Sequence, residues 1–217
     1  MMMIAAMMIA AMNANAQNEV GQVTLQPKVG MNISKITGSD MKTKAGLTAG
    51  FEAEYGVAEN FGITAGLLYS MQGAKRDFKG VADGVNYSST FKLNIDYINI
   101  PVLAQYYVVK GLAVKAGVQF GFVVRNKAKL DGSAVGISIK DDWSVNEFLD
   151  YCKQLGPGIP NDAKLNKFDF SIPVGLSYEY ESFVLDARYN IGTSKVIKGD
   201  SGKNGVFQLT IGYKFAL

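Results

Sequence analysis

Charged side chains recur at alternate positions within segments that are otherwise apolar, and any chemistry of this chain would be built from them. Asp186 and Arg188, for example, stand between apolar residues at positions 185, 187 and 189. Alternation places such charges on one face of a strand, where opposite charges can form ion pairs. The charged residues in this setting are Lys28, Lys44, Glu52, Glu54, Asp96, Lys115, Glu179, Asp186, Arg188 and Lys214.

Two interpretations of this charged face differ in function. In the first, the side chains form a salt-bridged plug, because a charge in a narrow interior is costly unless it is paired. In the second, they line a path for protons or a small solute. The near balance of cations and anions in the set favours the plug.

The composition excludes several other kinds of chemistry. The chain has no histidine and one cysteine, Cys152, so neither a Ser-His-Asp nor a Cys-His catalytic arrangement is available. One cysteine also excludes an internal disulfide and a multi-cysteine metal site. The net charge is only +3, without a dense basic run, which argues against nucleic acid as a partner. We therefore expect a non-enzymatic protein with no catalytic, cofactor-binding or metal-binding residues.

The elements that carry these charges are strands in which apolar and polar residues alternate with a period of two. The pattern predicts eight strands at about 24–34, 44–57, 61–72, 91–107, 112–125, 168–180, 183–193 and 205–215. Short connections at 58–60, 109–111 and 181–182 alternate with long ones at 35–43, 73–90, 126–167 and 194–204. Strict alternation of this kind is typical of an outer-membrane barrel with short periplasmic turns and long external loops.

The apolar face of these strands decides between a membrane barrel and a soluble lipocalin-like barrel that binds a ligand inside. That face carries no charged residue in any predicted strand, and a charge facing lipid at mid-membrane costs about 2–4 kcal/mol. Large aromatic residues also gather on it near the short turns, as in a girdle at a membrane interface. The sequence therefore predicts an all-β fold: an eight-stranded antiparallel up-and-down transmembrane β-barrel with one short helix in an extracellular loop.

Two local features are predicted in more detail. The alternation slips at Tyr97-Ile98, where two large apolar residues are adjacent, so we expect a β-bulge in that strand. A helix is expected at about 145–155, where Ser144 and Glu147 have the spacing of a capping box.

The external loops offer candidate surfaces for another envelope or extracellular protein. Trp143 and Phe148 flank the start of the predicted helix at hydrophobic-staple positions, and its apolar stripe packs either on the barrel rim or on a partner. Phe78 and Tyr87 lie in the segment 73–90, either in a solvated loop or in a protruding hairpin whose edges permit strand addition.

Residues 1–16 are apolar and end in Ala14-Asn15-Ala16. This resembles the hydrophobic part of a secretion signal with cleavage near Ala16, although no basic residue precedes the apolar run. We expect residues 17–217 to form a single barrel domain.

Short motifs in the strands resemble the PorT-like outer-membrane β-barrel family. The motif at residues 97–103, YINIPVL, is similar to the Tyr-(Leu/Ile)-x-(Ile/Leu)-Pro strand of that family, and the segments 117–122, 185–192 and 211–215 are similar to its later strands. The resemblance implies a barrel in the outer membrane of a Gram-negative-type cell, embedded in outer-membrane lipid. The family transfers no catalytic residues. From the residues themselves we expect a structural or surface-interaction role, with a narrow pore or an accessory part of a transport or secretion assembly as the alternative.

Overall fold

The computed structural model describes residues 20–82, 85–134, 137–155 and 160–217, and the predicted secretion signal lies outside these ranges. The elements in chain order are β1 (Val23–Thr37), β2 (Lys44–Ala58), β3 (Phe61–Ala82), β4 (Val85–Val109), β5 (Leu112–Ala134), β6 (Ile137–Trp143), α2 (Val145–Leu155), β7 (Phe168–Tyr180), β8 (Phe183–Lys195), β9 (Lys203–Tyr213) and β10 (Phe215–Ala216).

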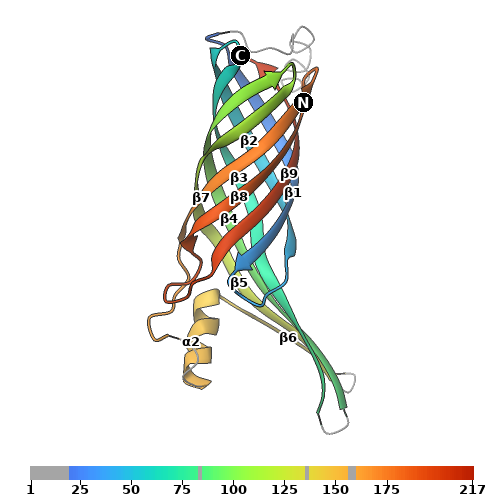
Figure 1. Cartoon of the computed structure of the whole chain (residues 1–217). Helices are drawn as coiled ribbons and strands as arrows, with labels where there is room; N and C mark the ends of the chain where they lie inside the picture. Colours follow the sequence, from blue (N-terminus) through green and yellow to red (C-terminus); the bar gives the residue numbers. More distant parts are fainter. Residues whose placement is uncertain (1–19, 83–84, 135–136, 156–159) are drawn as a thin grey trace, which may run out of the picture.

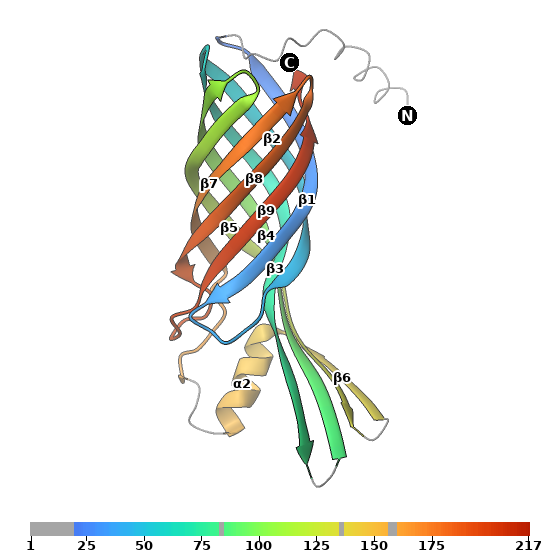
Figure 2. The same ribbon diagram turned by 45° about the vertical axis from the view of Figure 1, so that its right-hand side comes forward.

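Eight of the strands close into an antiparallel barrel (Figures 1 and 2). Each strand pairs with the next in the order β1-β2-β3-β4-β5-β7-β8-β9, and β9 pairs back onto β1. The short β10 adds to the start of β1, and β6 pairs only with the outer part of β5. The tight turns lie at one end of the barrel with the C-terminus, and α2 and β6 lie at the other. The predicted up-and-down topology is confirmed.

The barrel wall has apolar side chains outside and polar side chains inside. In β2, Leu47 and Phe51 are 60% and 47% exposed, whereas Thr48 and Glu52 are each 1% exposed. A soluble lipocalin-like barrel requires the opposite arrangement, so that alternative is wrong. Successive side chains of a strand point to opposite faces. A charged residue between two lipid-facing residues therefore points into the barrel.

Small residues let the strands approach closely on the inner side. Gly30 faces inward from β1, and a Cβ atom there would collide with the Leu209 carbonyl of β9. The tight turn between β4 and β5 uses Gly111 at φ 80°, a conformation that residues with a Cβ atom rarely adopt.

Three strands extend well beyond their predicted ends, and this corrects the expected long loop at 73–90. That segment is the outer part of a continuous β3–β4 hairpin, and β5 and β6 continue the same sheet. We call residues 73–82, 85–96, 125–134 and 137–143 the projecting sheet (Figure 2). Beyond the hydrocarbon core the outer face of the sheet need not be apolar. The alternation of apolar and polar residues that predicted the strands is therefore lost in this part of the sheet.

The irregularity predicted at Tyr97-Ile98 is present, but the extra residue belongs to the neighbouring strand. Asp96 pairs with Arg125 and Tyr97 with Val123, so that Val124 of β5 is skipped. The β3–β4 ladder runs through the same region without a shift. Val124 and Arg125 are both exposed, as a bulge that directs two consecutive side chains outward requires.

The apolar core lies at the external mouth of the barrel. Val145 and Leu149 of α2 pack with Ile95 and Tyr97 of β4 and with Val196. Among the helices of the described residues, none is long and apolar enough to cross a membrane.

Candidate functional site

The barrel interior holds a compact group of charged side chains, which we call the ionic layer: Lys28, Glu52, Lys115, Asp186 and Arg188. Arg188 of β8 donates from Nη1 to Glu52 Oε1 at 2.7 Å and from Nε to Asp186 Oδ1 at 2.7 Å. Its Nη2 bonds both carboxylates, at 3.1 Å to Glu52 and 2.7 Å to Asp186. A planar guanidinium can bond two carboxylates at once, because its five N–H groups have a fixed geometry.

Two lysines complete the ionic layer from the facing strands. Lys28 Nζ lies 2.8 Å from Glu52 Oε2 and 3.5 Å from Asp186 Oδ2. Lys115 Nζ lies 2.9 Å from Asp186 Oδ2. All five side chains are at most 3% exposed. Their charges are therefore paired with one another and not with water.

A second group, the turn-end cluster, lies toward the short turns. Lys214 Nζ is 3.0 Å from carboxylate oxygens of both Glu54 and Glu179 and donates to the Tyr107 hydroxyl at 3.1 Å. Tyr107 in turn donates to Glu54 at 2.9 Å. Tyr107 carries no charge and was not part of the predicted set, although its inward position follows from the alternation of β4.

Together the two groups are electrically balanced. The ionic layer has one cation more than it has anions, and the turn-end cluster has one anion more than it has cations. The cations Lys28, Lys115, Arg188 and Lys214 thus match the anions Glu52, Glu54, Glu179 and Asp186. Balance matters because an uncompensated buried charge costs several kcal/mol, of order 3–5, when a partner is missing.

Two predicted members of the charged set lie elsewhere. The Asp96 carboxylate accepts a bond from the Tyr69 hydroxyl at 2.6 Å and lies 3.6 Å from Arg125, so including it in the lumen network was wrong. The slip expected in β4 explains the error: the extra residue is in β5, so β4 keeps its alternation, with Ile95 and Tyr97 in the apolar core and Asp96 on the opposite face, across from Met71. Lys44 lies at the mouth, where its Nζ donates to the Gln72 carbonyl at 2.9 Å.

Between the ionic layer and the external mouth lie polar side chains, one of them the Asp169 carboxylate, that were not predicted. Asn32 donates to Ser70 at 2.8 Å, and Asn204 donates to both the Tyr97 hydroxyl and Asp169 at 3.1 Å. These groups occupy the same inward positions of the alternation as the charges do. A complete count of the inward charges would have found Asp169, and a count of all polar inward residues would have found the others.

The predicted capping box at the start of α2 is confirmed. The Ser144 amide donates to Glu147 Oε2 at 2.8 Å, and the Glu147 amide donates to Ser144 Oγ at 3.3 Å. The hydrogen bond from the Ser144 backbone, followed by the one from its side chain, holds the pKa of Glu147 below its usual value. The ionised Glu147 therefore stabilises the start of α2 above that pKa. This contribution is lost as the pH falls through the pKa and the carboxylate is protonated.

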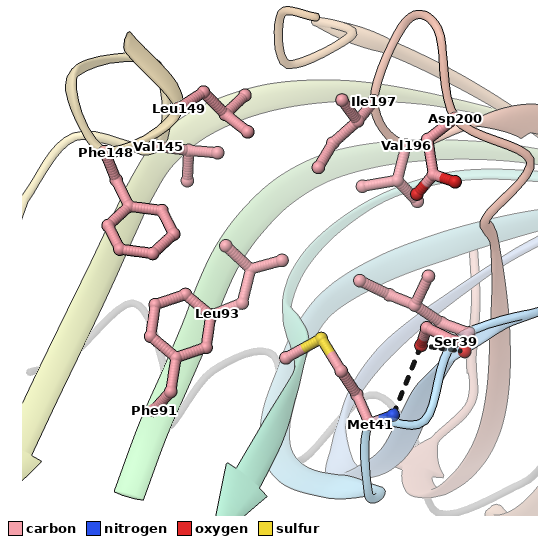
Figure 3. Close-up of a pocket in the computed structure, with 11 residues that line it drawn as sticks. Ser39, Met41, Phe91, Leu93, Val145, Phe148, Leu149, Val196, Ile197 and Asp200 are labelled. Atoms are coloured by element: carbon pink, nitrogen blue, oxygen red, sulfur yellow. Dashed lines mark hydrogen bonds between the residues drawn. The ribbon is translucent and has the colours of Figure 1, made fainter. Parts of the chain in front are cut away.

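The apolar stripe of α2 packs on the barrel rim, which was one of the two predicted alternatives; the other was a partner protein. Phe148 stacks on Phe91 of β4 with ring centroids 4.8 Å apart, and Trp143 lies 6.0 Å from Phe148. A mainly apolar cavity of about 100 Å³ lies between α2, β4 and the neighbouring loops (Figure 3). It is lined by Ile36, Ser39, Met41, Phe91, Leu93, Val145, Phe148, Leu149, Val196, Ile197 and Asp200.

The candidate interaction residues are only partly brought together. Trp143 and Phe148 touch and are half-buried, whereas Phe78 lies farther out on the projecting sheet and is 40% exposed. The backbone of Tyr87 lies in β4, but its side chain is outside the described part of the structure. The projecting hairpin, rather than a solvated loop, thus presents Phe78.

The chain resembles known proteins at the level of the whole barrel. The model of the outer membrane protein beta-barrel domain family matches residues 15–198. No curated protein matches. Among solved structures, the attachment invasion locus protein Ail of Yersinia pestis is 17% identical, with 91% of this chain and 100% of that chain covered and a TM-score of 0.41.

OprG of Pseudomonas aeruginosa is 12% identical, with 94% and 99% covered and a TM-score of 0.45. Neisserial surface protein A is 10% identical, with 89% and 96% covered and a TM-score of 0.41. The match to the family model spans most of the barrel strands. The barrel has the apolar exterior and polar interior of an outer-membrane protein. This chain belongs to the outer membrane protein beta-barrel domain family and is a protein of the Gram-negative outer membrane.

Proposed function

We propose that this protein is a non-conducting, non-enzymatic barrel that acts at the cell surface through its projecting sheet. The observation that carries the proposal is the continuation of β3, β4 and β5 beyond the barrel mouth, joined there by β6. A membrane anchor alone does not need such an extension. The sheet ends in two edges, the outer part of β3 and β6, and unpaired strand edges are places where a partner strand can add.

The closed lumen is the second part of the proposal. Eight strands leave an interior that side chains just fill. Arg188, Glu52 and Gln119 are among the largest fully buried side chains. On the external side, α2 and its apolar contacts lie over the mouth.

The purified protein in planar lipid bilayers is therefore expected to give no steady conductance steps. A general porin added to the same bilayer serves as the positive control. Reproducible channels from the purified barrel would instead support the alternative, a narrow pore or an accessory part of a transport or secretion assembly.

The lack of enzymatic activity rests on the available side chains. The chain has no histidine, and partial burial raises the pKa of the Cys152 thiol, which reduces its thiolate fraction at neutral pH. Within the described ranges, no three His, Cys, Asp or Glu side chains are grouped as metal ligands would be.

Finer assignments follow from the sequence. We place the chain in the PorT-like group because of the motif at 97–103, in which Tyr97 bonds Asn204 across the lumen while Ile100 faces outward. Removal of residues 1–16 as a secretion signal, leaving one barrel domain, completes the proposal.

Shortening the hairpin tests the surface role. Asp77 and Thr90 are directly paired, so residues 78–89 can be replaced by Asn-Gly, the preferred two-residue turn of a hairpin. We expect this variant to keep the gel-mobility shift on boiling that marks a folded barrel. It should lose the extracellular proteins that cross-link to the tagged wild type on intact cells.

The matched control is Asp83→Asn, which creates Asn-Gly at positions 83–84 and leaves the hairpin at full length. It should cross-link like the wild type. An identical set of cross-linked proteins from the shortened variant would contradict the proposed role of the projecting sheet.

A further inference from the structure

Lysines stand directly opposite one another on neighbouring strands at the external end of the barrel. Lys42 bridges to Lys75, Lys75 pairs with Lys92, and Lys92 pairs with Lys129, so one row crosses from the β1–β2 connection to β5. On the other side of the barrel, Lys195 of β8 pairs with Lys203 of β9. Directly opposite side chains on antiparallel strands have Cβ atoms about 4.5–5.5 Å apart, and like charges there destabilise the sheet.

Carboxylates neutralise only part of these rows. Asp77 lies 3.0 Å from Lys42, Asp131 lies 2.9 Å from Lys92, and Asp142 lies 3.1 Å from Lys129. Over the ranges that the structure describes, Lys75, Lys195 and Lys203 have no carboxylate oxygen within 4.0 Å. The Lys195–Lys203 pair in particular has no protein counter-ion there, so an external anion would relieve its repulsion.

The rows lie just beyond the apolar belt of the barrel. Phe207 is 42% exposed on the lipid-facing side of β9, and Lys203 is four residues farther out on the same face and also exposed. Four residues span about 13 Å along a strand, or roughly 10 Å in height at the usual tilt of a barrel strand. A bilayer has about 5–8 Å of headgroup region on each side of its hydrocarbon core, which these long side chains can reach.

Among the described residues at the opposite end of the barrel, no lysines are paired in this way. Its exposed charges near the tight turns include Lys110 together with Glu59 and Glu181. Tyr55 and Tyr178, 50% and 51% exposed, form part of the aromatic girdle there. The excess of basic residues is therefore confined to the end that faces the outer leaflet, and it is not a general property of this barrel.

We propose that the two lysine rows bind the phosphate groups of phosphorylated glycolipid headgroups in the outer leaflet. The side chains project sideways at headgroup depth, continuous with the lipid-facing wall, which favours a lipid over a soluble polyanion approaching the loop tips. A phosphate between paired lysines supplies the missing counter-ion, with charge-assisted hydrogen bonds. This proposal requires the membrane orientation but neither the closed lumen nor a protein partner.

Binding of lipid A in detergent solution tests the proposal. The folded barrel in dodecyl maltoside is titrated with bisphosphorylated lipid A and, separately, with the same lipid after its phosphates have been removed. We expect binding of the phosphorylated form that weakens as salt screens the charges. Each lysine removed near such a surface should weaken binding about fivefold, so K195Q/K203Q and K75Q/K92Q should each lose about 25-fold.

Lys110→Gln is the matched control, because Lys110 lies at the other end of the barrel; it should bind like the wild type. Equal affinity for the phosphorylated and dephosphorylated lipid would overturn the proposal, whether or not the variants fold. So would unchanged lipid A binding by both double variants. Dextran sulfate added as a third ligand identifies a soluble polyanion as the partner if the variants lose it alone and keep lipid A.

Discussion

Replacing Asp186 with asparagine is expected to lower the free energy of unfolding by about 3–5 kcal/mol, the usual cost of removing one partner of a buried ion pair. Asp186 is fully buried and bonds Arg188 and Lys115 at 2.7 and 2.9 Å. Asparagine keeps the shape but not the charge. Lys28, Lys115 and Arg188 would then share Glu52 as their only anion in the ionic layer.

The measurement is urea-induced unfolding of the barrel reinserted into lipid vesicles, followed by tryptophan fluorescence or by gel mobility. The decisive control is a second substitution, Lys28→Met, in the Asp186→Asn background. It removes a cation from the same layer and restores the original charge difference, so the double variant should be more stable than Asp186→Asn alone. If the two losses simply add, or if Asp186→Asn costs less than about 1 kcal/mol, as at an exposed pair, the ionic layer is not a coupled unit.

The sequence predicts the members of this network much better than their pairing. Lipid excludes charges from the outer face, so each apolar outward residue fixes the inward position of its neighbours. Arg188, however, bonds Glu52, which is 136 residues away in sequence. Which inward charges meet depends on the stagger of the strands when the barrel closes, and a single sequence does not specify that stagger.

The errors at Asp96 and in the projecting sheet have one physical origin. Alternation is informative only while lipid lies on one side of the strand and the ladder is regular. At Asp96 the skipped residue is in β5, whereas the prediction placed the slip in β4 and so assigned the aspartate to the wrong face. Beyond that point the hydrocarbon core no longer surrounds the strands, and their outer face carries cross-strand ion pairs such as Lys92–Asp131 instead of an apolar belt.

The lysine rows show the same dependence on register. Lys195 and Lys203 belong to different strands with a long connection between them, and in sequence each reads as an ordinary solvated residue. Only the pairing of β8 with β9 shows that they are directly opposite. The alternation of apolar and polar residues predicts the strands, but only the structure shows which side chains lie opposite each other on neighbouring strands.

Replacing Leu209 with arginine is expected to lower the free energy of unfolding in vesicles by about 2–4 kcal/mol, as for a cation placed at mid-membrane on the lipid face of a barrel. Leu209 lies in the middle of β9, is 43% exposed, and pairs with Met31 and Ala187 on the adjacent strands. Both of these neighbours are apolar, so the guanidinium must reach toward the headgroups or draw water into the bilayer.

Ser88→Arg is the matched control, because Ser88 is exposed on the projecting sheet beyond the apolar belt. The same guanidinium stays in water there, so the change should be within about 0.5 kcal/mol. Both variants are unfolded with urea in the same vesicles. Equal stabilities would mean that the outer face of β9 does not contact lipid, whereas a loss confined to Leu209→Arg locates the hydrocarbon core at the middle of the barrel.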